Sequence, residues 1–232
     1  MTAARPTTGS PGRTASRQHP TLDLEISLWA NDVLWIAGID EAGRGALAGP
    51  VAAAAVILPR MESIPPELEG VRDSKMMTPP QRESAARQIR EIAVTFGIGF
   101  ASAAEIDEIG ILPATRLACR RAVEALEIVP DHLLLDFIHL PDVPLPQTAI
   151  PKGDSRSLSI AAASVLAKTS RDALLVELDA EYPGYGFARH KGYGTAAHRE
   201  AIRKLGPSPV HRMTFAPMKV AGRESRVVSC ES

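Results

Sequence analysis

The sequence predicts an α/β fold: a mixed β-sheet flanked by helices and followed by a helical C-terminal segment. Three apolar segments that read as strands come first, and later strands alternate with helical stretches. This order is typical of a sheet with helices packed on it. Apolar residues make up 45% of the 232 residues and charged residues 23%, an ordinary globular balance. It excludes collagen-like, coiled-coil and wholly disordered chains.

The first two strands are predicted to form a hairpin. Residues 33–40 are largely apolar and end on Asp40, and residues 51–58 form a second apolar run. Between them, residues 41–49 contain three glycines, which predicts a turn.

Two capping boxes predict where helices begin. Thr78 and Gln81, with a proline at the first helical position, predict a helix that runs to about residue 92. After a third strand at residues 96–102, Ser102 and Glu105 predict a short helix. A longer helix is expected from Pro113 to about residue 128, because small and apolar residues recur there at helical spacing.

The second half of the chain supplies two more strands and two more helices. Residues 133–135 predict a short buried strand that ends on Asp136, and residues 148–151 a fifth strand. The longest helix is expected over residues 157–181 and another over residues 196–205.

Both ends of the chain are expected to be disordered tails around one catalytic domain. Residues 1–22 and 220–232 are polar, which leaves a domain over residues 23–219. No apolar run approaches the roughly 18 residues of a membrane helix, and the start lacks the apolar stretch of a secretory signal. Cys119 and Cys230 make no disulfide framework, which favours a reducing cytoplasm.

The charge is balanced overall but uneven along the chain. The net charge is −1, yet residues 183–219 hold seven Lys and Arg residues against Glu200 alone. Such a basic segment predicts a face for nucleic acid, because basic groups release counterions from phosphates. A merely solvated surface is the alternative.

Four carboxylates follow strands or apolar segments: Asp40, Glu41, Asp136 and Asp154. A sheet brings strand ends together, and acidic clusters suit hard divalent cations. Two such ions about 4 Å apart can clamp a phosphodiester. The alternatives are that Asp154 caps the next helix and that Asp136 caps a turn. Asp40 and Glu41 would share a site only if the strand ends or kinks there, since neighbours in a strand face opposite sides.

Six motifs carry a family resemblance. They are GIDEAGRG at residues 38–45, LAGPV at 47–51, Asp73-Ser74-Lys75, KGDSRSLSIAAASVLAKTSRD at 152–172, YPGYGFARHKGYGT at 182–195 and HRMTF at 211–215. In this order they resemble the ribonuclease HII family over roughly residues 33–217.

The resemblance implies a ribonuclease H-like fold and an Mg²⁺- or Mn²⁺-dependent endonuclease. Such an enzyme hydrolyses the RNA strand of RNA–DNA hybrids and nicks DNA 5′ to embedded ribonucleotides. The expected products carry 3′-hydroxyl and 5′-phosphate ends, a chemistry that serves DNA replication and repair.

The resemblance also assigns the four carboxylates as catalytic metal ligands. Asp154 is preferred to Asp172, because the family's acid follows a Lys-Gly pair ahead of the helix. Ala46 stands where many relatives have proline, and Phe137 where many have glycine. Neither departure removes a ligand.

Further residues are expected to read the substrate. The segment Gly43, Arg44 and Gly45 lets backbone groups approach a ribose, or it is a plain tight turn. Tyr193, between two glycines, is expected to sense the junction between ribose and deoxyribose; a loop-packing tyrosine is the alternative. Lys75 and Lys168 are candidates for phosphate contact, although Lys168 is also placed to pair with Asp172.

Three functional hypotheses follow. The leading one is a monomeric ribonuclease HII that acts on ribonucleotide-containing duplexes by two-metal catalysis. The second is a structure-selective DNA nuclease on a related fold. The third is a non-catalytic hybrid-binding module, which the intact acidic set disfavours, because a pure binder gains nothing from four carboxylates facing phosphates.

Overall fold

The computed structural model describes residues 19–218. Its strands are β1 (Ile36–Ala42), β2 (Val51–Ile57), β3 (Thr95–Ala101), β4 (His132–Asp136) and β5 (Gln147–Ile150). Its α-helices are α1 (Asp23–Trp29), α2 (Pro79–Ile92), α3 (Ala103–Ile109), α4 (Ile111–Glu124), α5 (Leu158–Glu181), α6 (Phe187–His190) and α7 (Ala196–Leu205). Three short 3₁₀ turns are η1 (Pro66–Leu68), η2 (Ser74–Met76) and η3 (Gly153–Ser155).

The five strands form one mixed sheet in the order β3-β2-β1-β4-β5. The pairs β1–β2 and β2–β3 are antiparallel, whereas β1–β4 and β4–β5 are parallel. The predicted hairpin and mixed sheet are thereby confirmed. Every residue of β2 is buried, because this strand lies inside the sheet and helices cover both of its faces.

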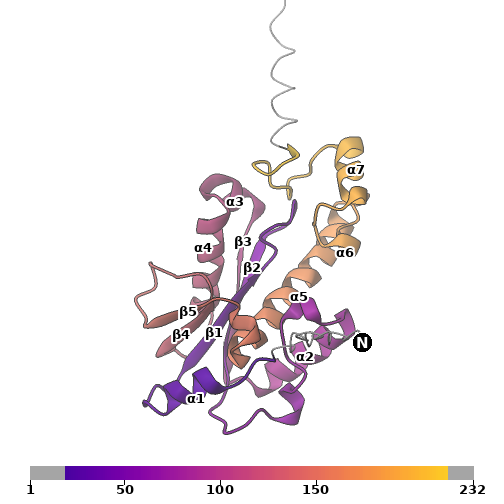
Figure 1. The fold of residues 1–232 in the computed structure, drawn as a ribbon. Helices are drawn as coiled ribbons and strands as arrows, with labels where there is room; N and C mark the ends of the chain where they lie inside the picture. Colours follow the sequence, from indigo (N-terminus) through magenta and orange to yellow (C-terminus); the bar gives the residue numbers. More distant parts are fainter. Residues whose placement is uncertain (1–18, 219–232) are drawn as a thin grey trace, which may run out of the picture.

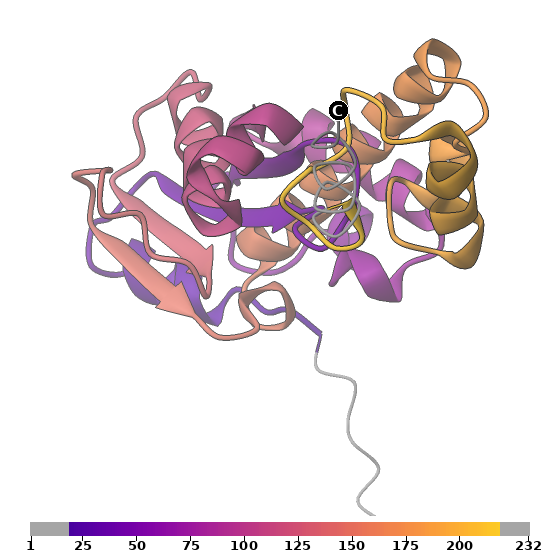
Figure 2. The same ribbon diagram turned by 90° about the horizontal axis from the view of Figure 1, so that it is seen from above.

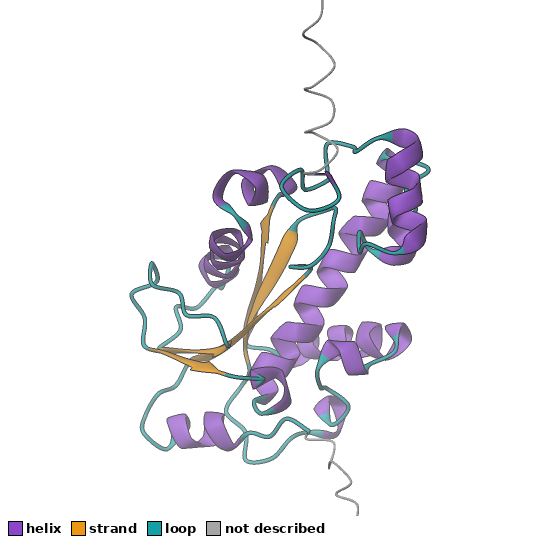
Figure 3. Cartoon of the chain, turned by 45° about the horizontal axis from the view of Figure 1, so that its top comes forward, coloured by secondary structure: helices purple, strands orange, loops and turns teal. Residues whose placement is uncertain are grey.

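Helices pack on both faces of the sheet, as Figures 1 and 3 show. α5 crosses one face so closely that a Cβ on Gly38 would lie 2.1 Å from the backbone carbon of Ser159. α4 covers the other face, where a Cβ on Gly99 would lie 2.1 Å from the carbonyl oxygen of Ala118. At both contacts the helix lies so close to the strand that there is no room for a side chain on the strand residue, which explains the glycines at these positions.

The C-terminal segment packs beside the end of α5, as seen from above in Figure 2. Phe187 is fully buried there, and its ring stacks on that of Tyr185 with the centroids 5.3 Å apart. Leu47, Leu175 and Met218 also belong to this small apolar cluster. It joins the basic segment to the loop after β1.

The two capping boxes are confirmed. Thr78 N–H donates to Gln81 Oε1 at 2.9 Å ahead of α2, and Ser102 N–H donates to Glu105 Oε2 at 2.8 Å ahead of α3. α4 begins at Ile111 instead of Pro113 and ends at Glu124, earlier than expected. Gly110, with φ of 85°, separates α3 from α4 and so sets this start.

β1 begins at Ile36, three residues later than predicted. The backbone N–H groups of Leu34 and Trp35 donate instead to the carboxylate of Asp131, at 3.1 and 2.8 Å. A side chain therefore replaces the sheet partner for these two residues.

The N-terminal boundary also differs from the expectation for residues 19–22. Thr21 N–H donates to the Arg156 carbonyl at 3.4 Å, and Leu22 is buried in the core. The unpredicted helix α1 follows and buries Glu25, whose Oε1 accepts bonds from Ser157 and Ser159. The other predicted tail residues, 1–18 and 220–232, lie outside the described residues. Among the described residues, no helix is both long and apolar enough to span a membrane.

Candidate active site

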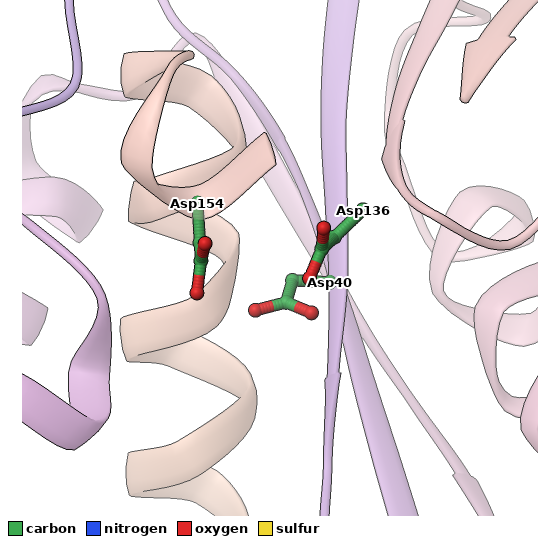
Figure 4. Close-up of side chains that lie close together, drawn as sticks. All are labelled: Asp40, Asp136 and Asp154. Atoms are coloured by element: carbon green, nitrogen blue, oxygen red, sulfur yellow. The ribbon is translucent and has the colours of Figure 1, made fainter. Parts of the chain in front are cut away.

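Three aspartates from separate segments meet at one edge of the sheet (Figure 4). β1 and β4 are parallel neighbours in register, so Asp40 and Asp136 lie side by side. Asp154 lies in η3 ahead of α5, and this turn is tied to β4 because Gly153 N–H donates to Asp136 Oδ1 at 2.8 Å. One carboxylate oxygen from each aspartate lies within 4.8 Å of the others.

The structure also tests the two alternative roles, that Asp154 caps the next helix and that Asp136 caps a turn. Ser157, not Asp154, caps α5, because its side chain accepts the Ile160 N–H at 3.2 Å. Asp136 does satisfy a turn N–H, and it does so while facing the other two aspartates.

Burial and mutual repulsion make the cluster unfavourable in its ionised form. Burial raises the pKa of Asp40 well above its usual value, and the charges of Glu41 and Asp136 raise it further. Burial, then Asp73 and Asp136, raise the pKa of Asp154 to about 6. A divalent cation offsets both effects, and oxygen donors are the ligands that Mg²⁺ and Mn²⁺ prefer. The donor set therefore fits such an ion.

Glu41 lies outside this three-residue cluster. β1 stays extended through Ala42, so Asp40 and Glu41 face opposite sides of the strand. The Glu41 carboxylate accepts a hydrogen bond from Arg44 Nη1 at 3.1 Å. Burial raises the pKa of Glu41, with Asp136 contributing, so its charge remains within reach of the cluster.

Lys75 lies beside the acidic cluster. Burial alone would lower the pKa of its ammonium group, but the carboxylates of Asp73, Asp40 and Asp154 outweigh that effect, so the pKa is raised. Its charge is therefore fixed next to the three aspartates. In the sequence, only the Asp73-Ser74-Lys75 motif indicates that Lys75 lies close to the aspartates.

The loop after β1 is held by a buried arginine, Arg212. Its guanidinium donates to the carbonyl oxygens of Gly43 and Arg44, both at 2.8 Å, and of Gly49 at 3.0 Å. Arg212 is one of the seven basic residues that predicted a face for nucleic acid, but it is fully buried and unavailable to a phosphate. Burial lowers its pKa to about 9, so it remains charged at neutral pH.

A second buried arginine, Arg171, holds the same loop from α5. It donates to the carbonyl oxygens of Pro50 at 2.8 Å, Ala48 at 3.1 Å and Lys191 at 2.9 Å. Gly43 has φ of 91°, and a Cβ there would lie 1.9 Å from Arg171 Nε. Both arginines were missed as site residues, although each lies inside a quoted motif.

Tyr193 and Lys168, two of the predicted substrate contacts, both line a pocket of about 640 Å³. Lys168 Nζ lies 5.5 Å from the centroid of the Tyr193 ring and 2.7 Å from Asp172 Oδ1. The predicted i, i+4 pair is thus present, and Asp172 is engaged away from the aspartate cluster. Tyr193 is partly exposed, so its ring is accessible from this pocket.

Three histidines lie beneath the Tyr193 loop. The rings of His190 and His198 stack with centroids 4.2 Å apart, and His198 Nδ1 lies 3.0 Å from the Tyr193 carbonyl oxygen. His198 Nε2 lies 3.1 Å from His211 Nε2. His198 and His211 are buried, so both serve to pack and support the loop and neither reaches a phosphate.

The basic segment presents fewer free charges than its composition indicates. Arg189, Arg199, Arg203 and Lys204 are exposed, but Arg203 and Lys204 both pair with Glu200. Lys219 lies outside the described residues.

Comparisons of the sequence and of the structure with known proteins match the same family. Residues 37–218 match the family model of ribonuclease HII. A ribonuclease HII of Dehalococcoides mccartyi is 54% identical over 200 residues, which are 84% of this chain and 92% of the relative. One of Geobacillus kaustophilus is 56% identical over 203 residues, 88% of this chain and 76% of the relative. The crystal structure of ribonuclease H2 from Pyrococcus horikoshii matches with a TM-score of 0.68 and 25% identity, covering 83% of this chain and 99% of that one.

Proposed function

This chain belongs to the ribonuclease HII family, and from that premise we propose how its residues cut nucleic acid. The protein is a ribonuclease H endonuclease that acts on the RNA strand of RNA–DNA hybrids. We further propose that it nicks duplex DNA 5′ to a single embedded ribonucleotide and leaves 3′-hydroxyl and 5′-phosphate ends.

The observation that carries the catalytic proposal is the convergence of three carboxylate oxygens within 4.8 Å. Asp40, Asp136 and Asp154 would hold divalent ions, Mg²⁺ or Mn²⁺, at the site of cleavage. When bound, such ions activate a water and stabilise the leaving oxygen. Glu41 contributes a fourth carboxylate only when β1 turns at this point and its side chain leaves Arg44 Nη1, because in the extended strand it faces away from Asp40.

The substrate is held by groups on both sides of the acidic cluster. Lys75 offsets the charge of a phosphate that approaches the three aspartates. The loop at Gly43 and Arg44 is anchored by the buried Arg212, and it presents its backbone to the ribose. An anchored backbone distinguishes ribose from deoxyribose because the 2′-hydroxyl can both donate and accept.

Tyr193 and Lys168 form the second contact region. The Tyr193 ring packs on the sugar after the ribonucleotide, and Lys168 supplies charge beside it. The proposed partner is ribonucleotide-containing duplex DNA, bound by a monomer in the cytoplasm.

One cleavage assay tests these proposals. Three end-labelled duplexes are compared: all-DNA, DNA with one ribonucleotide, and an RNA–DNA hybrid. We expect metal-dependent cutting of the second and third only, with upstream products that a DNA polymerase extends from the 3′-hydroxyl and downstream products that lose a 5′-phosphate to a phosphatase. Cutting of all-DNA would favour a structure-selective DNA nuclease, and tight binding without cutting would favour a binding module.

A further inference from the structure

Phe137 is a large apolar side chain left in solvent beside the acidic cluster. Its side chain is 71% exposed, whereas Ile138 and Leu140 in the same loop are 5% and 1% exposed. The loop is therefore packed, and it buries its smaller apolar side chains while projecting the largest one outward. Burial in the fold does not explain the aromatic ring at this position.

The backbone of Phe137 also disfavours a bulky residue. Its φ is 63°, and Ile138 N–H donates to the Asp136 carbonyl at 2.7 Å, which closes a three-residue turn. Positive φ at the centre of such a turn is strained for any residue with a large side chain. A glycine would relieve the strain and lose little packing, so the ring is present against both local preferences.

The position of Phe137 links it to the bond that is cut. It directly follows Asp136, so its Cα lies about 3.8 Å from that of a cluster residue. Its N–H donates to the Ile150 carbonyl at 3.2 Å, which fixes the backbone to the end of β5. An exposed ring on a fixed backbone, one residue from Asp136, is therefore within reach of a duplex whose phosphate lies at the cluster.

We propose that Phe137 is a substrate-binding residue that packs its ring on a nucleotide next to the cleaved bond. This inference rests on the proposed function, because it takes the acidic cluster as the place of cleavage. An aromatic face suits any base or sugar, so the contact adds affinity without sequence preference. The cost of exposing the ring to water in the free protein is then offset when substrate covers it.

The test replaces Phe137 and measures stability and KM separately. Phe137→Gly removes the ring and relieves the turn, so its melting temperature should equal or exceed that of the wild type. Its KM for DNA with one ribonucleotide should rise about ten-fold, equivalent to ~1.4 kcal/mol. The value of kcat should change much less, because the carboxylates are untouched. Phe137→Trp, which keeps an aromatic face, should retain a KM near that of the wild type.

Asp32→Gly is the matched control for the backbone effect. Asp32 has φ of 61° and lies before β1, at the end of that strand away from Asp40. This variant gains the same glycine at positive φ, and its KM should stay at the wild-type value.

Three outcomes overturn the inference or separate it from the proposed function. An unchanged KM in Phe137→Gly, with a wild type that cuts, overturns the role of Phe137 alone. A melting temperature well below that of Asp32→Gly shows that the ring supports the fold, and this too overturns it. If the wild type cuts neither ribonucleotide substrate, the proposed function fails. Binding of a fluorescent hybrid without metal then still decides whether Phe137→Gly weakens the contact.

Discussion

His198 and His211 share a hydrogen bond between their Nε2 atoms, 3.1 Å apart, and the groups at each end fix where the protons lie. The Ser208 backbone N–H donates to His211 Nδ1 at 2.9 Å, so the proton of that ring is on Nε2. His211 therefore donates to His198, which in turn donates from Nδ1 to the Tyr193 carbonyl. The relay supports the Tyr193 loop and requires both rings to be neutral.

We expect this relay to make stability depend on pH. Burial lowers the pKa of His198 to about 4, below its usual 6.5, so the unfolded chain takes up the proton first as the pH falls. The stabilisation is complete above pH 6.5 and is lost toward pH 4. Between pH 7 and 4.5 the free energy of unfolding should fall by about 2 kcal/mol more in the wild type than in His198→Asn.

Denaturant unfolding at the two pH values measures this difference, and the titrating groups outside the relay contribute equally to both proteins. His139→Gln changes an exposed histidine and should keep the wild-type loss. An identical loss in His198→Asn and the wild type would contradict the relay.

Asp40→Asn should separate catalysis from stability. Cleavage should fall by far more than ten-fold, a loss above ~1.4 kcal/mol, because the variant lacks a charged metal ligand. The metal-free variant should melt at a higher temperature than the wild type, since Asp40 is buried and its charge is repelled by Glu41 and Asp136. Mn²⁺ should raise the melting temperature of the wild type more than that of the variant.

Calorimetry with and without Mn²⁺, together with the cleavage rate, checks both parts. Asp142→Asn, at an exposed acid outside the cluster, is the control and should match the wild type. Retention of more than a tenth of the wild-type rate in Asp40→Asn would mean that Asp40 is not an essential ligand.

Tyr193 substitutions should distinguish cutting from substrate choice. Tyr193→Phe keeps the ring and should retain most activity, whereas Tyr193→Ala should cut DNA with one ribonucleotide about ten-fold to a hundred-fold more slowly. A continuous hybrid lacks an internal junction, so its loss should be smaller. Equal losses on the two substrates, measured as kcat/KM, would mean that Tyr193 only holds its loop in place.

Arg212→Lys should damage the loop after β1 although it keeps the charge. A single ammonium group cannot replace the guanidinium that donates to Gly43, Arg44 and Gly49. Leaving buried carbonyls unsatisfied should lower the free energy of unfolding by about 2–4 kcal/mol, and kcat/KM should fall with it. Arg203→Lys is the control, because Arg203 is exposed and pairs only at the surface, and its change should stay below about 0.5 kcal/mol.

Deleting the terminal segments should leave stability unchanged until the N-terminal deletion reaches Leu22. Deleting residues 1–18, and likewise 219–232, should leave stability and cleavage nearly unchanged, because neither segment contains a residue of the six motifs. Extending the N-terminal deletion through Leu22 should cost about 1.5–3 kcal/mol, since it removes a buried leucine and the Thr21 contact to Arg156. Thermal melts of the three truncated proteins measure this step. Equal stability after both N-terminal deletions would contradict the docking of Leu22.

Local signals in the sequence were sufficient for most elements of the fold. Thr78 with Gln81, and Ser102 with Glu105, specify helix starts through bonds that span three residues. The apolar run that forms β2 needs no distant partner to be recognised. By contrast, α1 was missed, because a large part of its attachment comes from Glu25 bonding to Ser157 and Ser159, far along the chain.

Some residues of the site could likewise be identified from the sequence, and others only from the tertiary structure. The motifs of this sequence named Asp40, Asp136 and Asp154 as acids at the ends of apolar segments, and parallel pairing of β1 with β4 brings the first two together. Only the tertiary structure decided that Arg212, which lies in a basic stretch of the sequence, is the buried support of the Gly43 loop. The physical reason is range: patterns along the chain encode bonds within a few residues, whereas the partner of a buried arginine or histidine depends on which backbone groups folding leaves unsatisfied.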